Sequence, residues 1–174
     1  MGKFAIAAGH TVYGQSGYGA CGLLKESEET RKVVNELLVL LRRKGHTAIN
    51  CTVDKAHSVM GYLSEQVRLA NESEAPLFIC VHFNCSNGKG KGVECYSWKA
   101  NRLKEAVKIC NNISMFGFKN RGIKDGTNYY IVKHTTMNAI LVEVCFLDSI
   151  DDVRLYKEVG AKGIAYAIFN AIAS

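Results

Sequence analysis

The most constraining feature of this sequence is a short apolar run, residues 77–82, which begins directly after the only proline of the chain. Apolar runs of this length are typical of strands that are buried on both faces of a sheet. The run ends on His82, and the chain then becomes polar at Asn84 and Ser86. Ligands of open α/β sheets bind beyond the carboxyl ends of the strands, so the pattern predicts a metal or substrate site near His82. A core histidine that hydrogen-bonds loop backbone is an equally weighted interpretation at this point.

Two further apolar runs each have a polar residue, within the run or just after it, that could take part in a metal site. Residues 4–8 are apolar and lead to His10, and residues 139–147 are apolar apart from Glu143. An unpaired charge inside an apolar strand is costly, so Glu143 needs a partner, a proton or a metal nearby. Two histidines at strand ends and one carboxylate within a strand are what a catalytic zinc site requires.

Strand-like and helix-like segments alternate along most of the chain. Strands are expected at residues 4–8, 47–53, 77–82, 92–98, 129–132 and 138–144, and helices at residues 26–44, 62–74, 102–115 and from 152 to about 172. Residues 92–98 alternate, which indicates a partly exposed strand, antiparallel at an edge, and residues 120–124 are expected to form a polar turn. The alternation predicts an α/β fold: one domain with a twisted, mostly parallel central sheet of about six strands and helices on both faces.

Composition limits the class of protein further. The length of 174 residues suits one domain with a sizeable core, and no apolar run approaches the roughly 20 residues that span a bilayer, so we expect no membrane insertion. The first strand starts too early for a signal peptide, which predicts synthesis in the cytoplasm. The formal net charge of +6 favours polyanionic partners, but no arginine-rich or aromatic-interleaved motif points to nucleic acid. The seven cysteines form no CxxC pair and are interpreted as small buried residues of a reduced protein.

The segment after His10 is rich in glycine and is expected to form an active-site loop that comes close to a ligand. A helix follows it, and its first turn offers three carboxylates, those of Glu26, Glu28 and Glu29. An exposed acid in this turn is also favoured by the helix dipole, so position alone does not choose among the three. There is no HExxH helix, which excludes the usual zincin pattern.

Several motifs match a known family along nearly the whole chain. They are GH at residues 9–10, LSEQVRLAN at 63–71, LFICVHFN at 77–84, GVECYSW at 92–98, NRGIK from residue 120 and YYIVKHTTMNAILVEVCFLD from residue 129. The chain resembles the zinc-dependent N-acetylmuramoyl-L-alanine amidases of the amidase-3 type. The GHT with a following GYGA is similar to phage and prophage endolysins of Gram-positive bacteria.

The resemblance implies a function and assigns residues to it. The family's helix length, counted back from Gly45, selects Glu26, so that Zn²⁺ is expected on His10, Glu26 and His82 with Glu143 as the essential acid. The activity implied is hydrolysis of the amide bond between N-acetylmuramic acid and L-alanine in peptidoglycan, as in an endolysin or autolysin. Residues 1–174 are then expected to be a catalytic domain without a wall-binding module, monomeric, and released to the wall with the help of a holin.

The sequence departs from the family pattern at two places, and two alternative functions are also considered. Ala7-Ala8 stands where the family often has Asp-Pro, and Met137-Asn138 stands where it often has Met-Pro. A zinc carboxypeptidase would need an arginine in its pocket for a terminal carboxylate, with Arg68 and Arg121 as candidates. A non-catalytic wall-binding module is the other alternative.

Two further side chains have open roles. His134 is expected between the last two strands, where it either contacts the substrate or binds nothing. Cys80 shares a strand face with His82, but the supply of other ligands makes it a poor candidate for a metal ligand.

Overall fold

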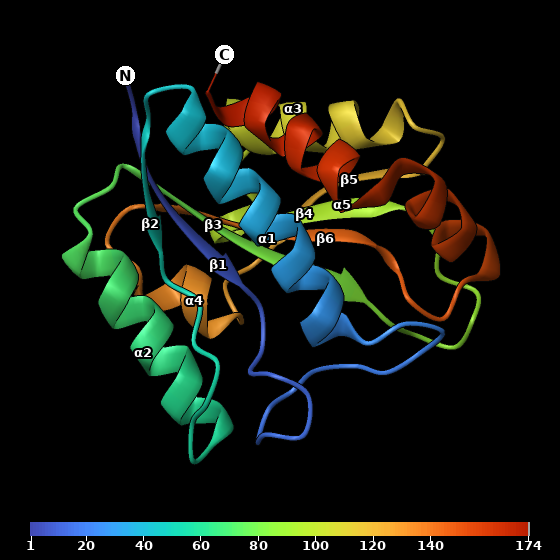
Figure 1. Cartoon of the computed structure of the whole chain (residues 1–174), viewed down its shortest axis with the longest axis horizontal. Helices are drawn as coiled ribbons and strands as arrows, with labels where there is room; N and C mark the ends of the chain where they lie inside the picture. The colour runs from blue at the N-terminus through green and yellow to red at the C-terminus, as the bar shows by residue number, and fades with distance from the viewer. Residues whose placement is uncertain (174) are drawn as a thin grey trace.

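A six-stranded sheet runs through the middle of the protein (Figure 1). The computed structural model describes residues 1–173. The strands are β1 (Lys3–Ala8), β2 (Thr47–Asn50), β3 (Leu77–Asn84), β4 (Val93–Ser97), β5 (Asn120–Asp125) and β6 (Asn138–Phe146), in the spatial order β2-β1-β3-β6-β4-β5. Strand β4 runs antiparallel to β6, and the other neighbouring strands are parallel. The expected α/β class with a mostly parallel sheet is confirmed.

Helices cover both faces of the sheet, three on one face and two on the other (Figure 1). The first face carries α1 (Glu26–Arg43), α3 (Lys104–Ser114) and α5 (Ile150–Ile172), and the second carries α2 (Val59–Glu72) and the short α4 (Tyr130–His134). A 3₁₀ turn, η1 (Trp98–Ala100), follows β4. Among the described residues, no helix combines the length and the apolar character that crossing a bilayer requires.

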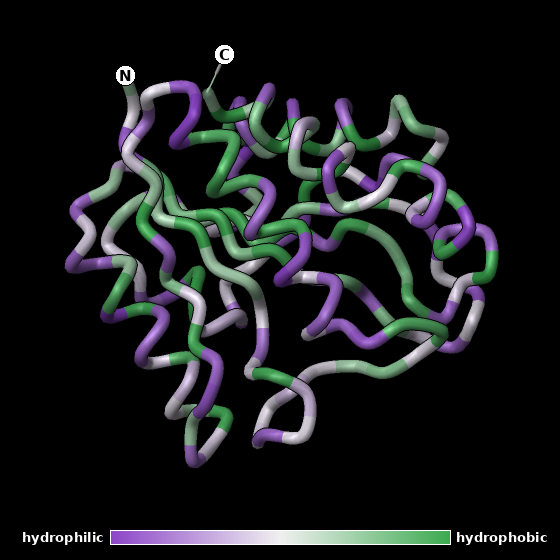
Figure 2. Tube along the Cα trace, in the orientation of Figure 1, coloured by the Kyte–Doolittle hydropathy of each residue, from purple (hydrophilic) through white to green (hydrophobic). Residues whose placement is uncertain are grey.

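Hydrophobic residues follow one another along the central strands, as the green middle of the trace in Figure 2 shows, and they pack into a core on each face of the sheet. In β3, Ile79, Val81 and Phe83 pack towards α1 and α5, whereas Phe78 and Cys80 pack towards α2 and α4. Side chains alternate between the two faces of a strand, so His82 shares the face of Cys80. By the same alternation Glu143 shares the face of Leu141. Both polar side chains therefore lie on the face that the two smaller helices leave partly open.

Three expectations about secondary structure are wrong. Residues 129–132 were expected as a strand because Tyr, Ile and Val favour strands, but they enter helix α4, where Ile131 and Val132 are buried against the sheet. Residues 120–124 form β5 rather than a turn; this edge strand is largely exposed, so it lacks an apolar alternation. Strand β4 is antiparallel as expected but lies inside the sheet, between β6 and β5, and is largely buried.

Candidate metal centre and active site

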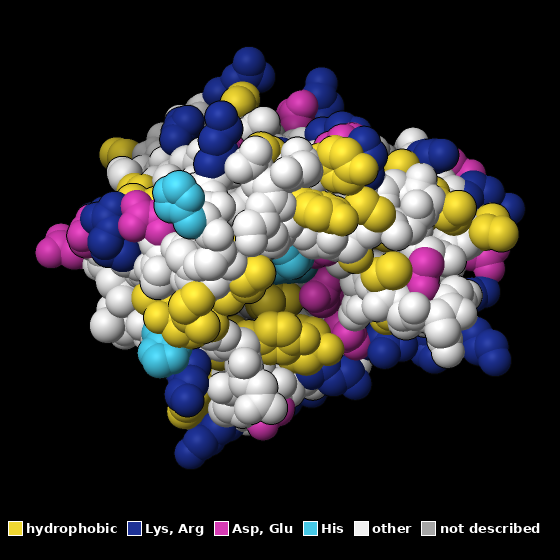
Figure 3. Space-filling model, turned by 90° about the horizontal axis from the view of Figure 1, so that it is seen from below, with side chains coloured by type: hydrophobic (Ala, Val, Ile, Leu, Met, Phe, Trp, Pro, Cys, Tyr) yellow, Lys and Arg dark blue, Asp and Glu magenta, His cyan; other side chains and the backbone are white. Residues whose placement is uncertain are grey.

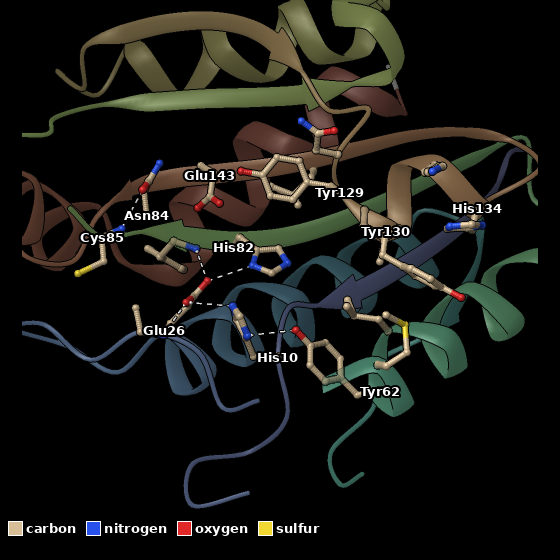
Figure 4. Close-up of a pocket in the computed structure, with 18 residues that line it drawn as sticks. His10, Glu26, Tyr62, His82, Asn84, Cys85, Tyr129, Tyr130, His134 and Glu143 are labelled. Atoms are coloured by element: carbon tan, nitrogen blue, oxygen red, sulfur yellow. Dashed lines mark hydrogen bonds and ion pairs between the residues drawn. The ribbon is translucent and has the colours of Figure 1, made fainter. Parts of the chain in front are cut away.

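A cavity of about 630 Å³ opens on the face of the sheet that α2 and α4 cover. Figure 3 shows it as a hollow with histidine and acidic side chains at its centre, surrounded by hydrophobic ones. His10, Glu26, His82 and Glu143 all line it, as the close-up in Figure 4 shows. The structure thus brings together every side chain that the sequence analysis selected for zinc and for catalysis.

Three of these side chains form a cluster that fits a metal ion. One ligand atom from each of His10, Glu26 and His82 lies within 4.8 Å of the others. The Glu26 carboxylate sits between the two rings, with Oε2 at 3.1 Å from His10 Nε2 and Oε1 at 3.0 Å from His82 Nδ1 (Figure 4). Within residues 1–173 this is the only group of three or more His, Cys, Asp or Glu side chains arranged in this way.

Glu26 is a buried carboxylate that stays ionised. It is the first residue of α1, and its oxygens also accept hydrogen bonds from the backbone N–H groups of Ala20 (2.9 Å) and Phe83 (3.1 Å). Burial by itself raises the pKa of Glu26, but the hydrogen bonds with His10 and His82 outweigh burial and hold the pKa well below its usual range. An ionised carboxylate beside two imidazoles is the donor set that a divalent metal needs.

The other two acids of the same turn point elsewhere. Glu28 pairs with Lys25 at the surface, with 3.2 Å between the charged atoms. Glu29 accepts a hydrogen bond of 2.9 Å from the Tyr156 hydroxyl, on the side of α1 that faces α5. Position in the fold therefore distinguishes Glu26 from its neighbours, which the sequence pattern alone did not.

His10 is held in place through both its ring and its backbone. Nδ1 lies 3.0 Å from the Gly17 carbonyl, which only accepts, so Nδ1 donates and Nε2 is left as the nitrogen available to a metal. The residue has a φ of 65°, and its carbonyl accepts a 3.0 Å hydrogen bond from Arg31 Nη2. The glycine-rich segment after His10 therefore orients a proposed ligand, as expected for an active-site loop.

Two glycines allow the chain to pass close to the cluster. A Cβ atom on Gly9 would lie 2.3–2.6 Å from ring atoms of His82. A Cβ atom on Gly19 would lie 2.6 Å from His10 Cδ2 and 2.7 Å from Glu26 Oε2, and the φ of this glycine is +82°. Neither position has room for a side chain, so the tight packing of the cluster requires glycine at both.

Glu143 lies beside the cluster without a partner of its own. On the sheet it is the direct neighbour of His82 in β3 and of Glu94 in β4. The side chain is buried, and its Oε2 makes no hydrogen bond. Burial raises the pKa of Glu143 well above the usual carboxyl value, and the nearby charges of Glu26 and Glu94 raise it further. Burial therefore favours the protonated form of this carboxyl, and carboxyl groups perturbed in this way cluster at sites of proton transfer.

Glu94 is a buried carboxylate that the sequence analysis did not select. It accepts hydrogen bonds from Asn84 Nδ2 (2.9 Å), the Tyr96 hydroxyl (2.9 Å) and Arg121 Nε (2.6 Å). In the sequence, Glu94 could have been noticed as an acidic residue within the alternating segment 92–98. If this segment formed an edge strand, Glu94 would be exposed; in the structure the strand lies inside the sheet and Glu94 is buried. The network holds Asn84, which lines the cavity.

The remaining candidates lie outside the metal cluster. His134 lines the far end of the cavity, with its ring centroid 4.2 Å from that of Tyr130. Cys80 is fully buried, and burial raises the pKa of its thiol, which opposes a thiolate ligand. Arg68 pairs with Glu65 and Glu72 at the surface of α2.

Arg121 is bound to Glu94, so neither candidate arginine is free to hold a carboxylate, and no arginine of the described chain lines the cavity. All seven cysteines are free, and five are buried as expected, whereas Cys21 and Cys85 are exposed.

Residues 5–174 match the family of N-acetylmuramoyl-L-alanine amidases named Amidase_3. The chain belongs to this family. It is 34% identical to an uncharacterised protein of Clostridium perfringens, over 98% of this chain and 51% of the relative. It is 29% identical to the endolysin of Bacillus phage SPP1, over 88% of this chain and 58% of that protein. The chain spans about half the length of the curated relatives it matches.

Solved structures agree with the family and the fold. The catalytic domain of the CD27L endolysin, which targets Clostridium difficile, superposes with a TM-score of 0.89 at 27% identity, covering 99% of this chain and 97% of that one. Cwp6 from Clostridium difficile gives a TM-score of 0.81 at 29% identity, covering 98% of this chain and 28% of that one. The resemblance stated from the sequence motifs is confirmed.

Replacing Gly9 by alanine tests the close packing of the cluster. The added Cβ atom would overlap the His82 ring and displace it, so we expect Gly9→Ala to lower zinc affinity at least about tenfold while the far-UV circular dichroism stays that of wild type. Gly61→Ala is the control, because its Cβ atom would meet the Ser58 hydroxyl at 3.2 Å and Ala56 Cβ at 3.7 Å, and no atom of the cluster. Wild-type zinc affinity in Gly9→Ala would contradict the packing described here.

The raised pKa of Glu143 predicts a pH-dependent stability of the metal-free protein. The proton on this carboxyl stabilises the fold, and that contribution is lost as the pH rises through the folded-state pKa. Glu143→Gln stays neutral, so its melting temperature should rise relative to that of wild type as the pH increases from about 4, where a glutamate of the unfolded chain ionises, towards the raised folded-state pKa. The measurement is thermal unfolding in chelator, with Glu158→Gln on the exposed surface of α5 as control. If the melting temperatures of wild type and Glu143→Gln change with pH in the same way, burial does not destabilise the ionised form of Glu143.

Proposed function

We propose that this chain hydrolyses the amide bond between N-acetylmuramic acid and L-alanine in peptidoglycan, with a zinc ion held by His10, Glu26 and His82. The observation that carries the proposal is one cavity that holds this cluster beside the unpartnered, buried carboxyl of Glu143. Membership of the amidase family supports the choice of substrate.

The donor set fits zinc in its catalytic form. Two imidazole nitrogens and one carboxylate are a known set of three protein ligands that leaves a further position open. Further hydrogen bonds orient two of the proposed ligands. His10 donates to the Gly17 carbonyl, and Glu26 accepts from two backbone N–H groups. A bound zinc ion supplies Lewis-acid chemistry, activating a water molecule and polarising the carbonyl to be cleaved.

Glu143 acts first as the general base and then as the general acid of this reaction. Its free Oε2 accepts a proton from the attacking water, and the same oxygen returns it to the nitrogen of L-alanine as the amide bond breaks. Burial and the charges of Glu26 and Glu94 favour the protonated form, so the carboxyl holds the proton between the two steps. Glu94, whose charge contributes to this shift, is itself paired with Arg121 and accepts hydrogen bonds from Asn84 and Tyr96.

Two alternatives receive less support. A carboxypeptidase would hold the terminal carboxylate best with an arginine, but Arg68 and Arg121 are both engaged with glutamates outside the cavity. The cavity lining of the described chain offers only the Lys133 ammonium, which lacks the bidentate geometry of a guanidinium. A non-catalytic binding module has no use for an unpartnered buried carboxyl next to a metal cluster. We therefore propose that residues 1–174 act as a catalytic domain whose place of action is the cell wall, where the substrate lies. Dependence on a holin and a monomeric state stay predictions.

Two variants separate metal binding from catalysis. Glu143→Ala should keep its zinc and its fold, because Glu143 is not a ligand, and should lose about 10²–10⁴-fold in rate. His82→Ala should lose both zinc and activity. Zinc content by atomic absorption is measured beside the release of intact stem peptides from purified peptidoglycan.

A near wild-type rate in Glu143→Ala would refute the assigned proton transfer. Loss of zinc in that variant would make Glu143 a ligand. Release of single terminal amino acids, in place of intact stem peptides, would favour the carboxypeptidase.

Removing the metal should abolish activity while sparing the fold. The two hydrophobic cores on either side of the sheet do not include the metal cluster, so the protein does not need zinc to fold. Circular dichroism and wall digestion are compared before and after a chelator, and again after zinc is restored. Global unfolding in chelator would show that the ion has a structural role as well.

A further inference from the structure

A second groove lies next to the active-site cavity, at the C-terminal end of α4 and along the segment that joins α4 to β6. Its volume is about 390 Å³, and its lining includes Trp98, Lys133, Thr135, Thr136 and Asn138. Lys133 lines both the groove and the active-site cavity, so the two are neighbours across this side chain. Figure 4 shows Tyr130 and His134, the first and last residues of α4, on the side of the active-site cavity away from Glu26. The groove therefore extends the same face of the protein.

Trp98 is the only tryptophan of the chain, and 44% of it is exposed. The two residues that follow it, Lys99 and Ala100, both have left-handed backbone with φ values of 51° and 54°, although neither is glycine. The turn is held by two hydrogen bonds, one from Ser97 Oγ to the Asn101 carbonyl (2.6 Å) and one from the Asn101 N–H to the Trp98 carbonyl (2.9 Å). Strained backbone of this kind clusters at ligand sites. The Trp98 ring next to this turn is partly exposed to solvent, with Lys99 Nζ 6.0 Å from its centroid.

The lining of the groove has the chemistry of a sugar site. Trp98 offers an aromatic face, Thr135 and Thr136 offer hydroxyls, and Asn138 offers an amide. No acidic side chain of the described residues lines the groove. A pyranose ring has an apolar C–H face that stacks on an aromatic ring and a rim of hydroxyl groups that hydrogen-bond with such polar side chains.

The position of the groove fits a sugar that is not the one being cleaved. Strand β4 pairs Glu94 with Glu143 and Tyr96 with Leu141. Trp98 comes four residues after Glu94 in the sequence, so it lies about 14 Å further along the strand direction. A muramic acid whose amide lies at Glu143 does not reach that far, but a neighbouring sugar of the glycan does.

We propose that the groove formed by Trp98, Lys133, Thr135, Thr136 and Asn138 binds a pyranose unit of the peptidoglycan glycan strand, next to the muramic acid whose amide is cleaved. The identity of the ligand rests on the proposed amidase function. The groove then helps the enzyme select polymeric wall over short muramoyl peptides.

The single tryptophan makes binding directly measurable. Glycan strands from which the stem peptides have been removed are titrated into the wild-type protein while tryptophan fluorescence is recorded. We expect a saturable blue shift and reduced quenching by acrylamide, because the stacked sugar shields the exposed ring. Asn138→Leu, which removes a polar partner but keeps the fluorophore, should weaken binding about tenfold. An unchanged spectrum at saturating glycan would overturn the proposal.

Kinetics on two substrates give the second test. Trp98→Ala should raise the KM for intact walls about tenfold with little change in kcat, and Trp98→Phe should restore part of this loss. The KM effect should be at least about fivefold smaller on a soluble muramoyl peptide with a single sugar, since it cannot reach the groove. Tyr166→Ala is the matched control, because this exposed aromatic residue lies on α5, on the opposite face of the sheet.

The outcomes separate the two proposals. Equal losses on both substrates, or an unchanged KM for walls in Trp98→Ala, would overturn the glycan groove. If wild type with zinc cleaves neither substrate, the proposed amidase function fails, whereas the fluorescence titration still decides whether the groove binds glycan.

Discussion

The buried carboxylate of Glu26 is the interaction on which the functional half of the structure depends. It contacts His10 after β1, His82 in β3 and the backbone of the loop that joins β1 to α1. A buried charge is tolerated only when it is paired and hydrogen-bonded, and each contact of Glu26 meets part of that requirement. The cluster is thus assembled by the chain itself, so a metal ion would enter a site whose donors already converge.

The cavity exists because the two layers of helices are unequal. Helices α1, α3 and α5 pack over one face of the sheet, and buried side chains of β3 and β6 fill the space beneath them. On the other face α4 is only five residues long and α2 lies to one side (Figure 1). This leaves room for the cavity that His82 and the largely buried Glu143 line. The same central strands therefore supply the core on one side and the chemistry on the other.

The strands that are buried on both faces could be predicted from the sequence. Strands β1, β3 and β6 were recognised because apolar residues continue through them, and His82 and Glu143 stood out because they interrupt that pattern. Strand β5 was missed because an exposed edge strand needs no apolar residues, and α4 was missed because tertiary packing overrides the strand preference of Tyr, Ile and Val.

Selection among similar residues needed three-dimensional information. Glu26, Glu28 and Glu29 share one helical turn, and only the direction of each side chain separates them. Glu94 was missed because β4 was expected at an edge, where an acid is ordinary, whereas the strand lies inside the sheet.

The order of the strands has a consequence for how the protein is made. Strand β6 is the last to be synthesised, yet it lies between β3 and β4, which emerge from the ribosome long before it. Until β6 inserts, the edges of β3 and β4 that will pair with β6 are open. During this time the carboxyl of Glu143, which lies on β6, is absent from the cavity. A chain interrupted before β6 therefore has the three proposed metal ligands but lacks Glu143, the residue proposed to transfer the proton.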